Sequence, residues 1–112
     1  MEIEKHNWPE KYDINKLVTI QNDIDKIINE TKTSVRRNDR YADPGDSLML
    51  DGHKVVVEHV YPQKLGEITE ENAQQEGYKS LEAYKNGITN IHGEDVWDPE
   101  QVVWVHELKV VG

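Results

Sequence analysis

The sequence contains no cysteine, which excludes disulfide bonds, thiolate nucleophiles and thiolate zinc sites. It also contains no phenylalanine, so five tyrosines and three tryptophans must supply the aromatic part of the core. No apolar run approaches the roughly 20 residues that a membrane helix needs, and the first residues lack the basic and apolar regions of a secretory signal. We therefore expect a cytoplasmic protein that does not enter a membrane.

The five histidines do not have the spacing of a metal site. Since cysteine is missing as well, the usual nitrogen and sulfur ligands of zinc are not brought together by any motif. We therefore expect neither a metal nor another cofactor.

Basic residues are scarce: 13 Lys and Arg face 22 Asp and Glu, which gives a formal net charge of -9. A chain this acidic is not expected to bind extended duplex DNA, because its surface repels phosphate. A local concentration of cations on such a chain nevertheless favours one anion-binding site. Four basic residues fall within the ten residues T-K-T-S-V-R-R-N-D-R at 31–40, namely Lys32, Arg36, Arg37 and Arg40. This stretch predicts a ligand that carries phosphate or carboxylate.

At 112 residues the chain is long enough for one hydrophobic core but not for two. Residues 1–15 are polar and show no sustained period, which predicts an irregular lead-in that Trp8 holds against the rest of the protein. Residues 16–112 are predicted to form a single domain.

Apolar periodicity and turn residues predict alternating strands and helices in this domain. Asp51-Gly52 between two apolar runs is a strong signal for a β-hairpin. The order of the elements predicts an α+β fold with short helices flanking a curled mixed sheet. The expected elements are a strand at 16–20, a helix at 23–30 with Asn22 as N-cap, strands at 33–37, 47–50 and 53–60 with Tyr61-Pro62 ending the last of these, helices from Thr69 to Glu76 and from Leu81 to Asn86 that end at Gly77 and Gly87, an irregular stretch at 88–99, and a strand at 101–111.

Several segments of the chain stand in a recognisable order. They are K-T-S-V-R-R-N-D-R at 32–40, P-G-D-S-L at 44–48, T-E-E-N-A-Q-Q-E-G-Y at 69–78, S-L-E-A-Y at 80–84 and V-W-V at 103–105. Together they resemble the ASCH domain family of the PUA-like superfamily. The resemblance implies a PUA-like β-barrel, and a cleft between the barrel and the helices that faces RNA or a modified nucleoside.

The chain also has a partial resemblance to a bacterial acetylcytidine amidohydrolase branch of this family. That branch uses a lysine and a threonine from an early strand and a glutamate from the following helix. Lys32 and Glu76 match the lysine and the glutamate. The position of the threonine is Val35 on an ungapped alignment, and Ser34 if a one-residue deletion is allowed. Because one residue along a strand moves a side chain to the other face, the register of Ser34 decides whether a catalytic group can form.

The leading hypothesis from the sequence is an RNA- or nucleotide-binding protein. Trp97 could stack on a base. Since alternate residues of a strand face opposite ways, at most two of the three arginines are expected to contact the ligand. The cleft is expected to be bordered by Lys32, Arg36, Arg37, Arg40 and Glu76.

Two other functions remain open. One is a small amidohydrolase that deacylates an N-acylated cytidine, with Ser34 or Thr33 as nucleophile, Lys32 activating it and Glu76 handling protons. The other is a non-catalytic protein-interaction module, which is expected if Trp97 or the lead-in fills the cleft.

Overall fold

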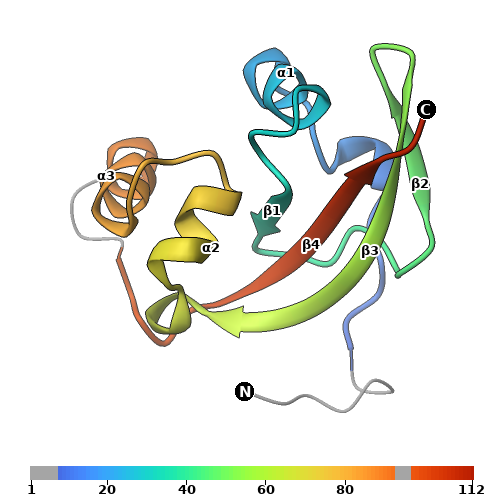
Figure 1. Cartoon of the computed structure of the whole chain (residues 1–112). Coiled ribbons are helices and arrows are strands. Elements are labelled where there is room, and N and C mark those ends of the chain that lie inside the picture. Colours follow the sequence, from blue (N-terminus) through green and yellow to red (C-terminus); the bar gives the residue numbers. More distant parts are fainter. Residues whose placement is uncertain (1–7, 93–96) are drawn as a thin grey trace.

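The structure is a computed structural model that describes residues 8–92 and 97–112. Within these residues, four strands form one antiparallel sheet in the order β1-β4-β3-β2, which curls into a half-barrel (Figure 1). The predicted α+β fold with a curled sheet and short helices is confirmed, although the described sheet is antiparallel rather than mixed. None of the described helices is long and apolar enough to cross a membrane. In chain order the elements are η2 (Ile14–Lys16), α1 (Gln21–Ile28), β1 (Ser34–Arg37), β2 (Ser47–Leu50), β3 (His53–Lys64), η3 (Leu65–Glu67), α2 (Glu70–Gln75), α3 (Leu81–His92) and β4 (Val102–Val110).

The predicted strand at 16–20 is wrong, because the chain forms a turn there. Asp13 accepts a hydrogen bond from the Asn15 amide and starts the 3-10 helix η2. Leu17 and Val18, which follow this helix, are both buried. A strand with one buried face would bury only alternate residues. Burial of two neighbours therefore reflects a turn that packs both side chains into the core.

Helix α1 begins earlier than predicted. Asn22 lies inside the helix, and Ile20 is the N-cap residue, in an extended conformation without a side-chain cap. Ile27 is the buried residue of this helix, and Ile24 packs against the same core. The apolar spacing therefore predicted the helix correctly but not its first residue.

The hairpin of β2 and β3 is confirmed. Asp51 and Gly52 have φ values of 47° and 84°, as a tight turn between twisted strands requires. The predicted end of β3 at Tyr61-Pro62 is wrong, since the strand continues to Lys64. Strand β2 pairs only with His53–Val56, so the rest of β3 has one edge without a strand partner among the described residues. Proline is tolerated at such an edge because its missing N–H interrupts no ladder there.

Glycine plays two different roles in the helical region. Gly77, at φ 91°, follows the C-cap residue Glu76 and ends α2 as predicted. The predicted helix end at Gly87 is wrong, because α3 continues through it to His92. A Cβ at Gly87 would lie 3.0 Å from Cε1 of Tyr78, so this glycine allows close packing of a ring against the helix. The irregular stretch predicted at 88–99 is therefore helical up to residue 92, and its residues 93–96 lie outside the described ranges.

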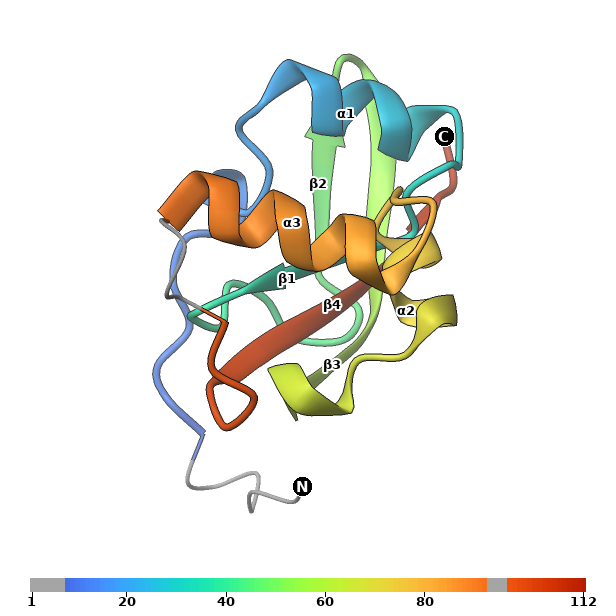
Figure 2. The ribbon, with the colours of Figure 1, turned by 90° about the vertical axis from the view of Figure 1, so that its left-hand side faces the viewer.

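The sheet packs a separate hydrophobic cluster on each face. The predicted terminal strand is confirmed as β4, and it contributes to both clusters because neighbouring residues of a strand point to opposite faces. Trp104 belongs to the first cluster, where Trp8 of the lead-in meets it edge-on with ring centroids 5.1 Å apart. Val103 belongs to the second cluster, beneath α3, which crosses β1 and β4 in Figure 2. Trp8 thus holds the described part of the lead-in to the sheet, as predicted.

Candidate functional site

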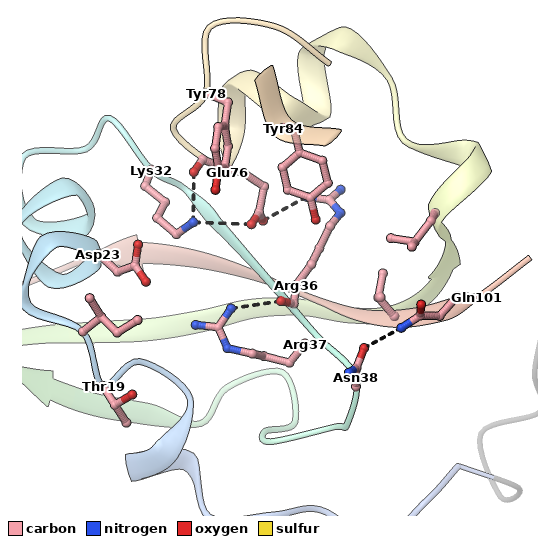
Figure 3. Close-up of a pocket in the computed structure, with 13 residues that line it drawn as sticks. Thr19, Asp23, Lys32, Arg36, Arg37, Asn38, Glu76, Tyr78, Tyr84 and Gln101 are labelled. Atoms are coloured by element: carbon pink, nitrogen blue, oxygen red, sulfur yellow. Dashed lines mark hydrogen bonds and ion pairs between the residues drawn. The ribbon is translucent and has the colours of Figure 1, made fainter. Parts of the chain in front are cut away.

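A pocket of about 480 Å³ lies along β1, between α1 on one side and α2 and α3 on the other (Figure 3). The segment that leads into α1 supplies Thr19 and Ile20, and the first turn of α1 supplies Asp23. The pocket is within the size range of sites that hold a small ligand. Its charged and aromatic wall is formed by Lys32, Arg36, Arg37, Glu76, Tyr78 and Tyr84.

Four polar side chains meet beside this pocket, three of them in its lining, and each is almost excluded from solvent. Ser34 is 1% exposed, Glu76 4%, Lys32 5% and Arg36 6%. The Glu76 carboxylate stands at their centre. Its Oε2 accepts hydrogen bonds from Ser34 Oγ at 2.8 Å and from Arg36 Nη1 at 3.0 Å, and its Oε1 lies 3.4 Å from Lys32 Nζ.

The local structure explains why these side chains converge. Lys32, Ser34 and Arg36 alternate along the chain, so they point to the same side of β1. Glu76 is the C-cap residue of α2. The Thr33 amide donates a hydrogen bond of 2.7 Å to the Gln75 carbonyl, which ties the end of α2 to the start of β1.

The structure resolves the register that the sequence left open. Ser34 faces Lys32 and Glu76, whereas Val35 is fully buried in the first hydrophobic cluster on the opposite face of the sheet. Thr33 is exposed and does not contact Glu76. Of the predicted nucleophile candidates, Ser34 is the one whose hydroxyl lies in the buried group.

Arg36 has a donor that no other described residue uses. Its Nε binds Gln63 at 2.9 Å, and its Nη1 binds Glu76 and Ser34. Its Nη2 is the one buried side-chain nitrogen or oxygen without a hydrogen-bond partner among the residues that the structure describes. Buried donors are nearly always paired, so an unpaired guanidinium nitrogen beside a pocket points to a ligand acceptor.

Two tyrosines from the helical region line the pocket next to this guanidinium. Tyr78 and Tyr84 meet edge-on, with ring centroids 5.2 Å apart. Burial raises the pKa of both hydroxyls, that of Tyr84 far above its usual value. Both groups therefore stay protonated at neutral pH and can donate hydrogen bonds. Sequence reasoning missed these residues, although both lie in the segments that carry the family resemblance.

Arg37 lies at the open edge of β1 and is fixed by backbone contacts. Its Nε donates to the Leu17 carbonyl at 3.1 Å, and its Nη1 donates to the Arg36 carbonyl at 2.9 Å. The next residue, Asn38, accepts a hydrogen bond of 2.8 Å from Gln101 and closes that end of the pocket. Figure 3 shows the guanidinium groups of Arg36 and Arg37 on opposite sides of β1.

The other two predicted ligand contacts do not line this pocket. Arg40 binds Asp43 at 2.6 Å and the Pro9 carbonyl at 3.0 Å, and lies over the ring of Trp8. It therefore fastens the lead-in and does not line this pocket. Trp97 packs edge-on against Tyr84 in the second hydrophobic cluster and does not line this pocket either.

A metal site is not apparent in the described ranges, where no group of three or more His, Asp or Glu side chains is placed to hold an ion.

No protein-family model and no curated protein matches the sequence. Solved structures that match include the ASCH domain from Lactobacillus crispatus JV V101, with a TM-score of 0.65 and 15% sequence identity over 80% of this chain and 70% of that chain. Another is a DUF984 protein from Enterococcus faecalis V583, with a TM-score of 0.63 and 16% identity over 79% of this chain and 66% of that chain. These similarities identify the architecture: the chain has an ASCH-like fold.

Proposed function

We propose that this protein binds RNA or a nucleotide-like ligand in the pocket along β1. The observation that carries the proposal is the buried Arg36 guanidinium, which is held by Glu76 and keeps one nitrogen without a partner beside two tyrosines. Unstacked nucleotides present acceptor oxygens and nitrogens together with a flat ring, which suits a wall of donors and aromatic side chains. The family resemblance of segments 32–40 and 69–78 supports the same class of ligand.

Titration of single-stranded RNA oligonucleotides and free nucleosides at two salt concentrations tests this proposal. Binding is expected at low salt, and RNA binding should weaken as salt increases, because bound phosphates release counterions. Arg36→Gln should lower the affinity. Lys54→Gln removes the same charge from an exposed position on the hairpin and should leave the affinity nearly unchanged. If neither RNA nor nucleosides bind at low salt, the proposal is wrong.

A second candidate function is hydrolysis of the N-acyl group of an acylated cytidine. It is favoured by the 2.8 Å hydrogen bond that Ser34 Oγ donates to Glu76 Oε2. In such a reaction Glu76 would take the hydroxyl proton while Oγ attacks the acyl carbon. The C–N bond would then break, the amine would leave with that proton, and water would cleave the acyl-serine ester. Since Ser34 is only 1% exposed, binding without catalysis remains the first candidate.

Incubation with N4-acetylcytidine, followed by detection of free cytidine and acetate, tests this second candidate. Ser34→Ala should abolish release of cytidine because it removes the nucleophile. Lys32→Ala should lower it, since Lys32 contacts both the carboxylate and the carbonyl of Glu76. Activity that survives Ser34→Ala, or that is undiminished in Lys32→Ala, would exclude the mechanism.

The third possibility, a protein-interaction module, depended on the cleft being filled by the protein itself. Neither Trp97 nor residues 8–15 line the pocket. Within the described residues, the condition for this alternative is therefore not met.

A further inference from the structure

The three cations of the pocket differ in their partners. Lys32 and Arg36 share the Glu76 carboxylate, at 3.4 Å and 3.0 Å. Arg37 forms no ion pair with any residue that the structure describes. Of the three, it is therefore the cation that no carboxylate of the described residues contacts.

Arg37 is also held in place before any ligand binds. Two of its nitrogens donate to the Leu17 and Arg36 carbonyls, which fix the plane of the guanidinium. Carbonyl partners do not neutralise its positive charge. Among the residues that the structure describes, its Nη2 has no hydrogen-bond partner, and this nitrogen is not one of the buried unpaired atoms. An ordered guanidinium loses little conformational freedom when it binds an anion.

The position of Arg37 complements that of Arg36. The two guanidinium groups lie on opposite sides of β1, and both line the same pocket (Figure 3). The buried end, with Arg36, Tyr78 and Tyr84, offers donors and rings that suit a base. The open edge of β1, with Arg37, offers a charge.

We propose that Arg37 binds a phosphate group of the ligand, so that the pocket selects a nucleotide or an RNA phosphodiester over the unphosphorylated nucleoside. This inference rests on the proposed function and specifies the ligand class of the same site. Arginine suits the role because its planar donors match phosphate oxygens. The Asp23 carboxylate also lines the pocket and has no ion pair among the described residues, so it opposes an anion there. Arg37 should therefore strengthen phosphate binding, and Asp23 should weaken it.

The experiment compares matched ligands by isothermal titration calorimetry at low salt. The ligands are the four ribonucleosides, their 5′- and 3′-monophosphates, the corresponding dinucleotides and inorganic phosphate. The phosphorylated member of a pair is expected to bind roughly tenfold or more tightly than its nucleoside. Two outcomes would support the inference and show which phosphate Arg37 binds. If the dinucleotide binds more tightly than both monophosphates, it is an internal phosphodiester. If a monophosphate binds more tightly, it is a terminal phosphate.

Two variants in the pocket separate the phosphate contact from other contributions. Arg37→Gln should lower the affinity for the phosphorylated ligand much more than the affinity for the nucleoside, and so remove the advantage of the phosphate. Asp23→Asn should increase that advantage, because it removes the opposing charge. Lys54→Gln, on the hairpin, should leave it unchanged. An advantage that persists in Arg37→Gln would overturn the inference.

A measurement on the unmodified protein does not depend on how Arg37→Gln folds. The affinity of the nucleotide should fall more steeply with salt than that of the nucleoside, since only the nucleotide brings a phosphate to the site. If nucleosides and nucleotides bind equally tightly, the inference that Arg37 binds a phosphate is wrong, while the proposed function stands. If no ligand binds, the proposed function fails and the inference fails with it.

Discussion

Replacing Glu76 with alanine is expected to lower the free energy of unfolding by about 3–5 kcal/mol. The Glu76 side chain is 4% exposed and is the carboxylate that both Lys32 and Arg36 contact. Without it, two buried cations lose their counterion, and the Ser34 hydroxyl loses its acceptor. Such a loss is a large part of the stability of a small domain. Urea unfolding at pH 7, followed by circular dichroism, measures the change.

A neighbouring carboxylate provides the control for this prediction. Glu71 lies exposed in the first turn of α2, and Glu71→Ala is expected to change stability far less. If Glu76→Ala is too unstable to measure, Glu76→Gln keeps the shape of the side chain. Adding Lys32→Met to Glu76→Gln should restore part of the stability, because it removes one of the unpaired charges. A loss below about 1 kcal/mol in Glu76→Ala would contradict the role of this carboxylate.

Acidification from pH 6.5 to below pH 4 is expected to cost about 3 kcal/mol of stability through His106 alone. This side chain is fully buried on β4. Its Nε2 accepts from the Tyr41 amide at 3.1 Å, so its Nδ1 carries the proton and donates to the Val35 carbonyl at 3.2 Å. The pKa of His106 is lowered from 6.5 to about 4, mainly by burial and in addition by the positive charges of Arg37 and Arg40. The folded state therefore favours the neutral ring, and its stability falls as pH drops through this range.

Comparison with His106→Gln isolates this contribution. Carboxylates also titrate in acid: the pKa of Asp46 is lowered by its hydrogen bond from the Asp43 amide and by Lys11. Both proteins share that part of the pH dependence, so the difference between their stability curves reports His106. Direct titration of the His106 ring by NMR in the folded protein serves if the variant does not fold. A midpoint near 6.5 would contradict the prediction.

Local sequence signals predicted the elements whose structure is local. Asp51-Gly52 predicted the hairpin because the backbone conformation of that turn depends on those two residues. Thr69 and Gly77 predicted both ends of α2, because helix caps are short-range interactions. The alternation of residues 101–111 predicted β4 and its two faces.

Contacts between distant residues decided the elements that the sequence did not predict. Gly87 looks like a helix end, but the ring of Tyr78 packs against it, and no local rule contains that contact. Leu17 and Val18 look like part of a strand, yet both enter a core built from the sheet. Pro62 looks like a strand end, but it lies where β3 has a free edge.

The candidate site was also predictable only in part. The family resemblance identified Lys32 and Glu76, and the charge of the 31–40 stretch identified the strand. The sequence did not show whether Ser34 or Val35 faces Glu76. A shift of one residue along the strand exchanges the two faces, and only the structure shows which side chain enters the core. Charge alone also did not show that Arg40 turns away to Asp43 and Pro9.

The pairing of β1 with β4 also determines when the pocket can form during folding. In the described residues β1 pairs with β4 alone, and Ser34 lies opposite Glu107, roughly 70 residues later in the chain. Contacts so distant in sequence form slowly, because closing the long intervening loop costs entropy. The hairpin of β2 and β3 can fold early, whereas β1 acquires its partner only once β4 has been synthesised. A nascent chain that stops before β4 should therefore contain the hairpin but lack the pocket.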